Sequence, residues 1–285
     1  VTFWNDDREQ SGKTMTAVAV ATKMAIERNF RILLISTSYN DPTIKNCYWG
    51  EDAKKTLKLF GGKNNNIGVE NGISGLEKLV ASNKLTPSTI TDYTRVIFKE
   101  RLEVINGFSK LEDKTPEENL EEYKKIDACY LELIKMANQN YDMVIVDLDK
   151  LLNSEIQNEI KNISNLNIYV FSQRLECLNR FNNLKNETKE IAGPKNLPVV
   201  GRYLNNTKYN IKNITKYLAE KKELHYIPFN MQFYEAAEEN GIVDMFLKMR
   251  NIRDKTDDNY IFMQNVLKLT NDIMKKLQEL QMKMR

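Results

Sequence analysis

The sequence is poor in the residues that build disulfide frameworks and zinc sites. Its three cysteines, Cys47, Cys129 and Cys177, are widely spaced and odd in number, and no C-x-x-C pair occurs. His225 is the only histidine. A disulfide-stapled fold and a cysteine–histidine zinc site are therefore excluded. This cysteine usage is typical of a protein from a reducing cytosol.

Long apolar runs and an excess of one charge are also missing. No apolar stretch approaches the roughly 18 residues that a membrane-spanning helix needs, and no signal peptide opens the chain. The 42 Lys and Arg against 39 Asp and Glu leave a formal net charge of +3, which is too small to require a nucleic-acid partner. The 285 residues, 41% hydrophobic and 28% charged, are typical of a cytoplasmic globular protein with one α/β domain and helical additions.

Residues 7–14 contain the second half of a phosphate-binding loop and lack the first half. In the pattern G-x-x-x-x-G-K-[ST], backbone N–H groups hold phosphates, the lysine reaches the β and γ phosphates, and the hydroxyl holds Mg²⁺. Gly12, Lys13 and Thr14 fit this pattern, whereas Asp7 stands at the first glycine. The nucleotide-binding residues expected in this segment are Gln10, Ser11, Gly12, Lys13, Thr14 and Met15.

The elements around this triplet have the order that a phosphate loop requires. Val1 to Trp4 is a short β-type run, Met15 to Arg28 has apolar residues at helical spacing, and Arg31 to Ser36 is a nearly continuous apolar strand. A helix N-terminus after a strand presents free N–H groups and a partial positive charge to an anion. The alternative is an ordinary helix N-terminus without a ligand.

Residues 141–147, Tyr-Asp-Met-Val-Ile-Val-Asp, form an apolar strand that ends in an aspartate. In the Walker B pattern such a carboxylate binds Mg²⁺ directly or through water. An aspartate that caps the loop after a core strand is the alternative, but the position of this strand downstream of the Lys13 helix favours the first interpretation. We therefore expect Thr14 and Asp147 to be the metal ligands.

Strands and helices alternate along the rest of the chain. We expect strands at 102–107, 167–172, 197–204 and 223–227, and helices at 72–82, 88–99 and 115–138. Asp41 and Pro42 mark a loop-to-helix junction. This alternation predicts an α/β fold with a mostly parallel sheet and helices on both faces, whose ligand binds at the carboxyl ends of the strands.

These motifs together resemble those of the ParA/MinD group of deviant Walker A ATPases, which are P-loop NTPases of the SIMIBI type, from Val1 to about Leu247. The family loop K-G-G-x-G-K-T-T aligns Arg8 with its signature lysine, and Glu9 and Gln10 with its two glycines. The family's late Ile-Pro strand and the helix after it match residues 226–229 and 235–241.

The resemblance implies ATP and Mg²⁺ as cofactors and a homodimer as the working form. The catalytic residues that it implies are Arg8, Lys13, Asp41 and Asp147. The adenine-binding residues that it implies are Pro228, Phe229 and either Asn205 or Asn206.

Departures from the family pattern predict weak or altered nucleotide binding. Relatives have an aspartate after the second strand that helps to orient the attacking water, and here Ser36 and Ser38 occupy those positions. Asp41 is close enough to substitute, although a helix cap explains it equally well. Acidic residues at positions 6, 7 and 9 flank the loop, and one carboxylate about 6 Å from a phosphate costs roughly 2–3 kcal/mol at an effective dielectric constant of about 20. These departures together predict slow or absent hydrolysis. The chain also resembles pilus-localisation members of the group, of the TadZ/CpaE kind, which are similarly degraded in these motifs.

The C-terminal segment has an apolar stripe at helical spacing and lysines at many of its other positions. We expect residues 1–250 to form the ATPase-like domain and residues 251–285 to form an amphipathic basic extension. A final helix packed on the domain, a dimer or partner helix, and a basic surface for DNA or an anionic membrane all fit this pattern.

Two functions fit the sequence. The first is an ATP-dependent dimer that positions cargo, such as a plasmid, a conjugative element, or a pilus or secretion assembly, at the nucleoid or inner membrane. The second is a non-hydrolysing scaffold that keeps the fold and recruits proteins. A ligase or kinase for small molecules is a third alternative, but no further catalytic constellation supports it.

Overall fold

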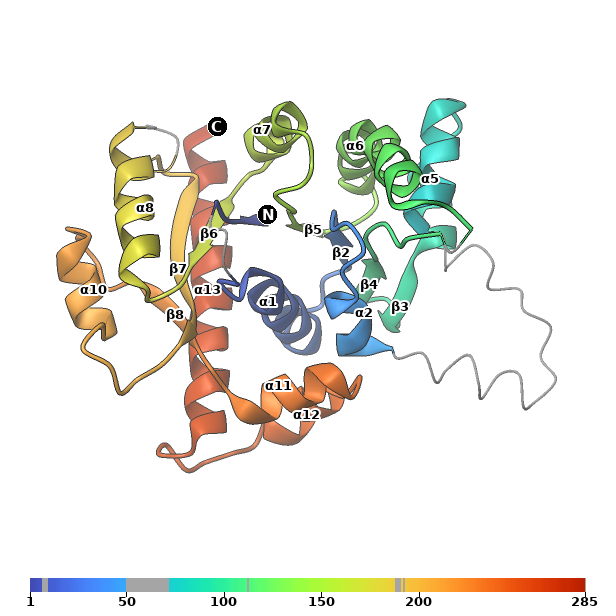
Figure 1. The fold of residues 1–285 in the computed structure, drawn as a ribbon. Helices are drawn as coiled ribbons and strands as arrows, with labels where there is room; N and C mark the ends of the chain where they lie inside the picture. The colour runs from blue at the N-terminus through green and yellow to red at the C-terminus, as the bar shows by residue number, and fades with distance from the viewer. Residues whose placement is uncertain (7–9, 50–71, 112, 188–190, 192, 285) are drawn as a thin grey trace.

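The computed structural model describes residues 1–6, 10–49, 72–111, 113–187, 191 and 193–284 (Figure 1). In this part of the chain, eight strands form one sheet in the order β3-β4-β2-β5-β1-β6-β7-β8. The strands are β1 (Thr2–Trp4), β2 (Ile32–Ser36), β3 (Arg95–Phe98), β4 (Leu102–Ile105), β5 (Met143–Asp147), β6 (Asn167–Phe171), β7 (Asn196–Tyr203) and β8 (His225–Pro228). Every neighbouring pair is parallel except β3 and β4. The predicted fold, a mostly parallel α/β sheet, is confirmed.

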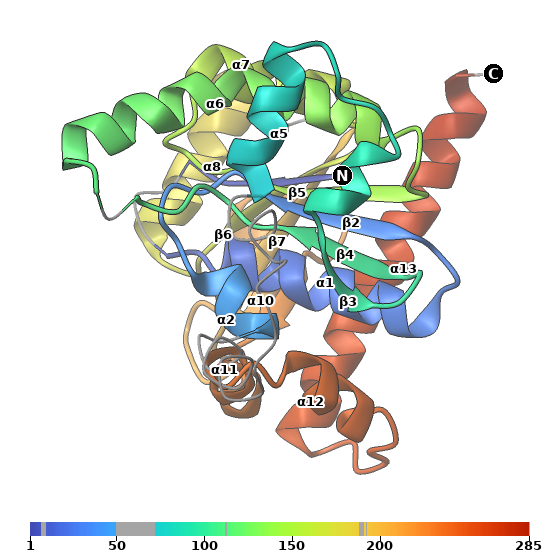
Figure 2. The same ribbon diagram turned by 90° about the vertical axis from the view of Figure 1, so that its right-hand side faces the viewer.

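Helices cover both faces of the sheet, which lies between them as a middle layer (Figure 2). One face carries α1 (Lys13–Glu27), α2 (Thr43–Tyr48), α11 (Met231–Glu238), α12 (Ile242–Met249) and α13 (Asp258–Met284). The other face carries α5 (Gly72–Ala81), the 3₁₀ helix η1 (Thr89–Tyr93), α6 (Pro116–Ala137), α7 (Ser154–Ile163), α8 (Leu175–Glu187) and α10 (Ile211–Tyr217). Side chains alternate along a strand, so Ile32 and Leu34 of β2 enter the first layer, and Leu33 and Ile35 enter the second.

The central strand β1 brings the two predicted motifs to the same edge of the sheet. It lies between β5 and β6, and Phe3 near its end is paired with Asp147 at the end of β5. Ser36 at the end of β2 is also paired with Asp147. The loop that leads from β1 into α1 therefore lies beside the aspartate that ends β5.

The predicted helix at residues 88–99 is wrong. Only Thr89–Tyr93 is helical, as one short 3₁₀ turn, and Arg95–Phe98 forms strand β3. The Thr86 hydroxyl accepts a hydrogen bond from the Thr89 N–H at 3.2 Å, at the start of this short turn. The β-branched and aromatic residues that follow pair antiparallel with β4, because long-range pairing decides where local propensity is weak.

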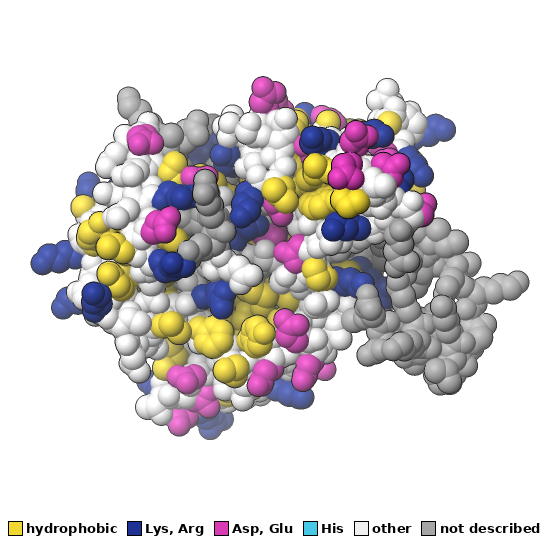
Figure 3. Space-filling model, viewed as in Figure 1, with side chains coloured by type: hydrophobic (Ala, Val, Ile, Leu, Met, Phe, Trp, Pro, Cys, Tyr) yellow, Lys and Arg dark blue, Asp and Glu magenta, His cyan; other side chains and the backbone are white. Residues whose placement is uncertain are grey.

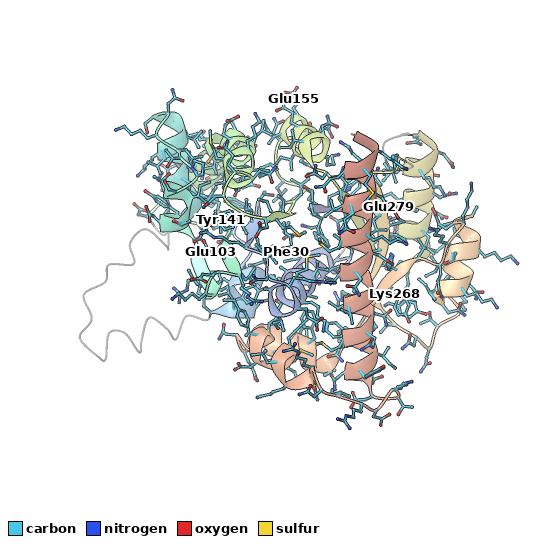
Figure 4. The ribbon with its side chains drawn as sticks, turned by 180° about the vertical axis from the view of Figure 1, so that it is seen from behind. Phe30, Glu103, Tyr141, Glu155, Lys268 and Glu279 are labelled. Atoms are coloured by element: carbon cyan, nitrogen blue, oxygen red, sulfur yellow. The ribbon has the colours of Figure 1, made fainter. Side chains whose placement is uncertain are left out.

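The final helix packs on the domain, which was one of the three alternatives. Phe262, Val266, Leu269 and Ile273 of α13 are fully buried against the core that also contains α1. Figure 4 shows α13 from behind, lying across the molecule with Lys268 and Glu279 on it. Among the described residues, no helix combines the length and apolar character needed to cross a bilayer.

Candidate functional site

A cavity of about 510 Å³ opens at the carboxyl ends of β1, β5, β7 and β8. Its wall is formed by the loop and first turn at 10–16, by residues 149–150 after β5, by Arg202 of β7, and by residues from β8 and α11. On the face shown in Figure 3, apolar side chains gather around α11 with acidic and basic side chains beside them. The volume lies within the range of roughly 300–1,000 Å³ that is typical of ligand pockets.

The loop before α1 leaves the helix N-terminus open toward this cavity. Gly12 is the N-cap residue with φ of 79°, a left-handed conformation that glycine adopts without the strain of a side chain. No side chain caps the helix, and its first turn contains no acidic residue. The Asn5 amide donates to the Ser11 hydroxyl at 2.7 Å and ties the loop to the end of β1. The free N–H groups of α1 are therefore available to an anionic ligand.

Lys13, Thr14 and Asp147 meet directly. The Lys13 ammonium donates to Asp147 Oδ1 at 2.5 Å and to the Leu148 carbonyl at 2.8 Å. The Thr14 hydroxyl donates to Asp147 Oδ2 at 2.9 Å. Asp147 is only 2% exposed, so this buried carboxylate is stabilised by a cation and a hydroxyl at once.

The donor set fits a magnesium–nucleotide complex. The Thr14 hydroxyl and the Asp147 carboxylate are hard oxygen ligands of the kind that Mg²⁺ prefers. Lys13 stands at the N-terminus of α1, where its charge adds to that of the helix dipole. These groups, expected from the sequence to act together, lie side by side in the structure.

No carboxylate stands at the positions of Ser36 and Ser38. Their hydroxyls are 2.8 Å apart and hydrogen-bonded, and both residues are buried. Gly107 comes so close that a Cβ built on it would be 2.3 Å from the Ser38 carbonyl oxygen. Asp41 lines the cavity, and its Oδ1 accepts from the Thr43 N–H at 2.9 Å and from the Thr43 hydroxyl at 2.6 Å. Asp41 precedes Pro42, the N-cap residue of α2, so it bonds to the first residue of the helix without being its cap.

Asp149 is a cavity residue that the sequence analysis missed. Its backbone N–H donates to the Thr37 hydroxyl at 2.8 Å, and its Oδ1 accepts from the Leu151 N–H at 2.8 Å. Burial raises the pKa of the Asp149 carboxyl, and the nearby Asp147 and Asp41 act in the same direction while Lys13 opposes them. Its position two residues after Asp147 was the available signal.

The other predicted residues divide into those at the cavity and those away from it. Gln10, Ser11, Met15, Pro228 and Phe229 all line the cavity. Asn205 and Asn206 are exposed and do not line it. Arg8 lies outside the described residues.

An aromatic wall and an arginine were also missed. Phe233 and Tyr234 line the cavity next to Phe229, with the Phe229 and Tyr234 ring centroids 6.5 Å apart. Asn230 holds this wall, since its side chain accepts from the Phe233 N–H at 2.8 Å. Arg202 also lines the cavity and lies against Gly12 of the loop. The sequence around it, near the end of β7, contains no recognisable motif.

Comparison of the sequence with protein-family models and with curated proteins gave no match. Comparison with solved structures gave many. A ParA family ATPase from Chlorobium tepidum TLS aligns with a TM-score of 0.65 at 15% identity, over 94% of this chain and 96% of that one. A candidate plasmid partition protein from Borrelia burgdorferi B31 bound to AMPPNP aligns with a TM-score of 0.60 at 14% identity, over 95% and 97%. The septum site-determining protein MinD from Pyrococcus horikoshii OT3, in complex with Mg-ADP, aligns with a TM-score of 0.60 at 15% identity, over 96% of each chain.

These similarities show the fold. The chain has the P-loop NTPase fold of the ParA/MinD ATPases, over nearly its whole length and nearly the whole length of each neighbour. Two of the three neighbours were solved with a nucleotide, AMPPNP in one and Mg-ADP in the other.

Proposed function

We propose that this protein binds ATP with Mg²⁺ in the cavity and works as a ParA/MinD-like dimerising protein that positions or recruits cargo, with slow or absent hydrolysis. The meeting of Lys13, Thr14 and Asp147 beside the open N-terminus of α1 carries this proposal. That arrangement offers a cation, two metal-ligand oxygens and free N–H groups to one polyanionic ligand.

Each residue has a defined part in this function. Lys13, which now donates to Asp147, would hold the phosphates of a bound nucleotide, and the Asp147 carboxylate and the Thr14 hydroxyl would hold the metal. Bound Mg²⁺ would neutralise charge on the phosphates. Pro228 and Phe229 supply an apolar wall for the base.

A non-hydrolysing scaffold is the second candidate, and the end of β2 favours it. Ser36 and Ser38 bond to each other and offer no carboxylate that could orient a water. The lost loop glycines and the acidic residues around Arg8 point the same way. In this candidate the domain, of the TadZ/CpaE kind, keeps the fold and recruits a protein partner without turnover.

The cargo class is proposed from the functions of the structural neighbours, one of which is described as a candidate plasmid partition protein and another as a septum site-determining protein. We propose a plasmid, a conjugative element, or a pilus or secretion assembly as cargo. Because the apolar stripe of α13 is buried, contact with DNA or an anionic membrane there would depend on its exposed lysines, such as Lys268 and Lys275.

Sedimentation velocity with and without Mg-ATP tests the nucleotide-driven dimer. We expect the wild-type mass to double with Mg-ATP and the Lys13→Ala variant to keep one mass, because Lys13 is the main phosphate cation. Lys84→Ala, at an exposed site away from the cavity, is the matched control and should behave as the wild type. Thermal melts must show that Lys13→Ala is folded, since removing one partner of a buried ion pair costs about 3–5 kcal/mol.

The outcomes separate the two candidates. A wild-type mass that stays constant while ATP binds supports the scaffold. If the wild type fails to bind ATP at all, the nucleotide proposal is wrong.

A further inference from the structure

Strand β7 contains one residue more than its neighbour at the edge of the cavity. Val200 is paired with Tyr226 and Tyr203 with Pro228, so three steps on β7 lie opposite two on β8. An irregularity of this β-bulge kind re-aims the side chain that it carries. Arg202 lies within it and has φ of 49°, a left-handed conformation that is strained for a residue with a side chain. Such strain persists only where surrounding contacts hold it.

Those contacts come from the phosphate loop. A Cβ on Gly201 would be 2.2 Å from the Ser11 carbonyl oxygen, so the end of β7 and the loop touch through backbone. A Cβ on Gly12 would be 2.6 Å from Arg202 Cγ. The alkyl part of Arg202 therefore lies directly over Gly12, at the N-terminus of α1.

The charge of Arg202 is at the cavity and has no acidic partner in the described part of the chain. Its Nη1 donates to Gln10 Oε1 at 3.2 Å, a neutral acceptor that lines the cavity. The Lys13 ammonium is instead held by Asp147 and the Leu148 carbonyl. A guanidinium carries a planar fork of donors that matches phosphate oxygens.

We propose that Arg202 is a phosphate-binding residue of this cavity, a second cation that contacts the phosphate chain of the nucleotide and covers the N-terminus of α1. This inference rests on the proposed nucleotide binding and deepens it. On ligand binding the guanidinium exchanges Gln10 Oε1 for phosphate oxygens, while its alkyl part stays over Gly12. The part of the ligand that it recognises is the phosphate chain rather than the base or sugar.

Calorimetric titration of ATP, inorganic tripolyphosphate and adenosine tests this role. Arg202→Met keeps the alkyl packing over Gly12 and removes the charge, and Arg202→Lys keeps the charge and removes the fork. Lys212→Met, on the exposed side of α10, is the matched control for lost charge. Hydrogen bonds to charged groups contribute about 1.5–3 kcal/mol, so Arg202→Met should weaken ATP and tripolyphosphate binding by about 10-fold or more.

The remaining measurements separate a charge role from a packing role. Adenosine affinity should be the same in all variants, Arg202→Lys should lie between wild type and Arg202→Met, and Lys212→Met should match the wild type. The inference is overturned if Arg202→Met binds both phosphate ligands as the wild type does, or if it loses adenosine as strongly as ATP. Tripolyphosphate binding that depends on Arg202 in a wild type that does not bind ATP overturns the proposed function alone, and a wild type that binds neither overturns both.

Discussion

Asp147 at the end of β5 bonds to two residues of the cavity wall, Lys13 and Thr14. It is nearly inaccessible to solvent, and it is balanced by Lys13 on one oxygen and by the Thr14 hydroxyl on the other. Asp149 lies two residues further along, and no cation is bonded to its carboxylate among the described residues. Burial raises the pKa of this carboxyl above its ordinary value. The two carboxylates therefore lie in different environments, because Asp147 is paired with a cation and burial raises the pKa of Asp149.

Asp149→Asn should gain stability relative to the wild type as the pH rises. Burial raises the pKa of Asp149 above its ordinary value of 3.8. Between that value and the raised one, the unfolded chain has lost a proton that the folded protein keeps, so the wild type loses stability with increasing pH. Asparagine does not titrate, and its amide oxygen can still accept the bond from the Leu151 N–H.

Urea unfolding at several pH values between about 3 and 8 measures this difference. The difference in the free energy of unfolding between Asp149→Asn and the wild type should grow as the pH rises above 3.8. It should stay constant once the carboxyl of the folded protein has also ionised. Asp92→Asn, at an exposed aspartate, serves as the control. A difference for Asp149→Asn that does not change with pH contradicts the prediction.

At the scale of elements, the amphipathic sequence of α13 was compatible with three arrangements, and its packing in the structure distinguishes them. Its apolar stripe lies against α1 and β8 in the main core. On its polar side, the Lys276 ammonium donates to the Asn196 carbonyl at 2.7 Å, and Asp272 lies 3.2 Å from His225. Both the apolar and the polar side of α13 contact the domain, so the helix stabilises the sheet edge formed by β7 and β8.

Leu269→Ala should therefore destabilise the whole domain. Leu269 is fully buried on α13, and a buried Leu→Ala change costs about 2–5 kcal/mol through lost burial and the cavity left behind. Lys275→Ala, on an exposed position of the same helix, should change the free energy of unfolding by less than about 0.5 kcal/mol. Denaturant unfolding followed by fluorescence measures both variants. Equal, small effects would mean that α13 contributes little to the core.

For the whole molecule, the order of the strands places the cavity where chain segments distant in sequence converge. Residues at the carboxyl ends of β1, β5, β7 and β8 reach the same edge of the sheet, which is the position at which α/β proteins bind ligands. The cavity is lined by Lys13 and Thr14 and by the aromatic side chains of Phe229, Phe233 and Tyr234. The end of β2 adds only two hydroxyls that bond to each other.

ATP turnover by the intact protein should be slow or absent. Ser36 and Ser38 carry no charge that could orient an attacking water, and the Asp41 carboxylate is already bonded to Thr43. Release of radiolabelled phosphate from Mg-ATP should stay close to that of Lys13→Ala. Turnover at the rates of ordinary ParA/MinD ATPases, lost in Lys13→Ala, would refute this expectation.

The sequence by itself determined the elements whose signals are local. Continuous apolar runs specified β2 and β5, and the Gly12 triplet specified the loop and the start of α1, since neighbouring residues alone decide such patterns. The two motifs also led us to expect Thr14 and Asp147 together as metal ligands, and in the structure the Thr14 hydroxyl donates to Asp147. The helix predicted at 115–138 is α6, which begins where Thr115 and Glu118 cap each other.

Tertiary structure alone decided the features that depend on distant partners. Residues 95–98 became a strand because β4 was available for pairing, and α13 became part of the core because α1 and β8 offered an apolar surface. Asn205 and Asn206 do not line the cavity, whereas Arg202 does. Arg202 lies at the extra residue that shifts the register between β7 and β8. Register and backbone irregularity arise only when two strands meet, so no pattern within one segment contains them.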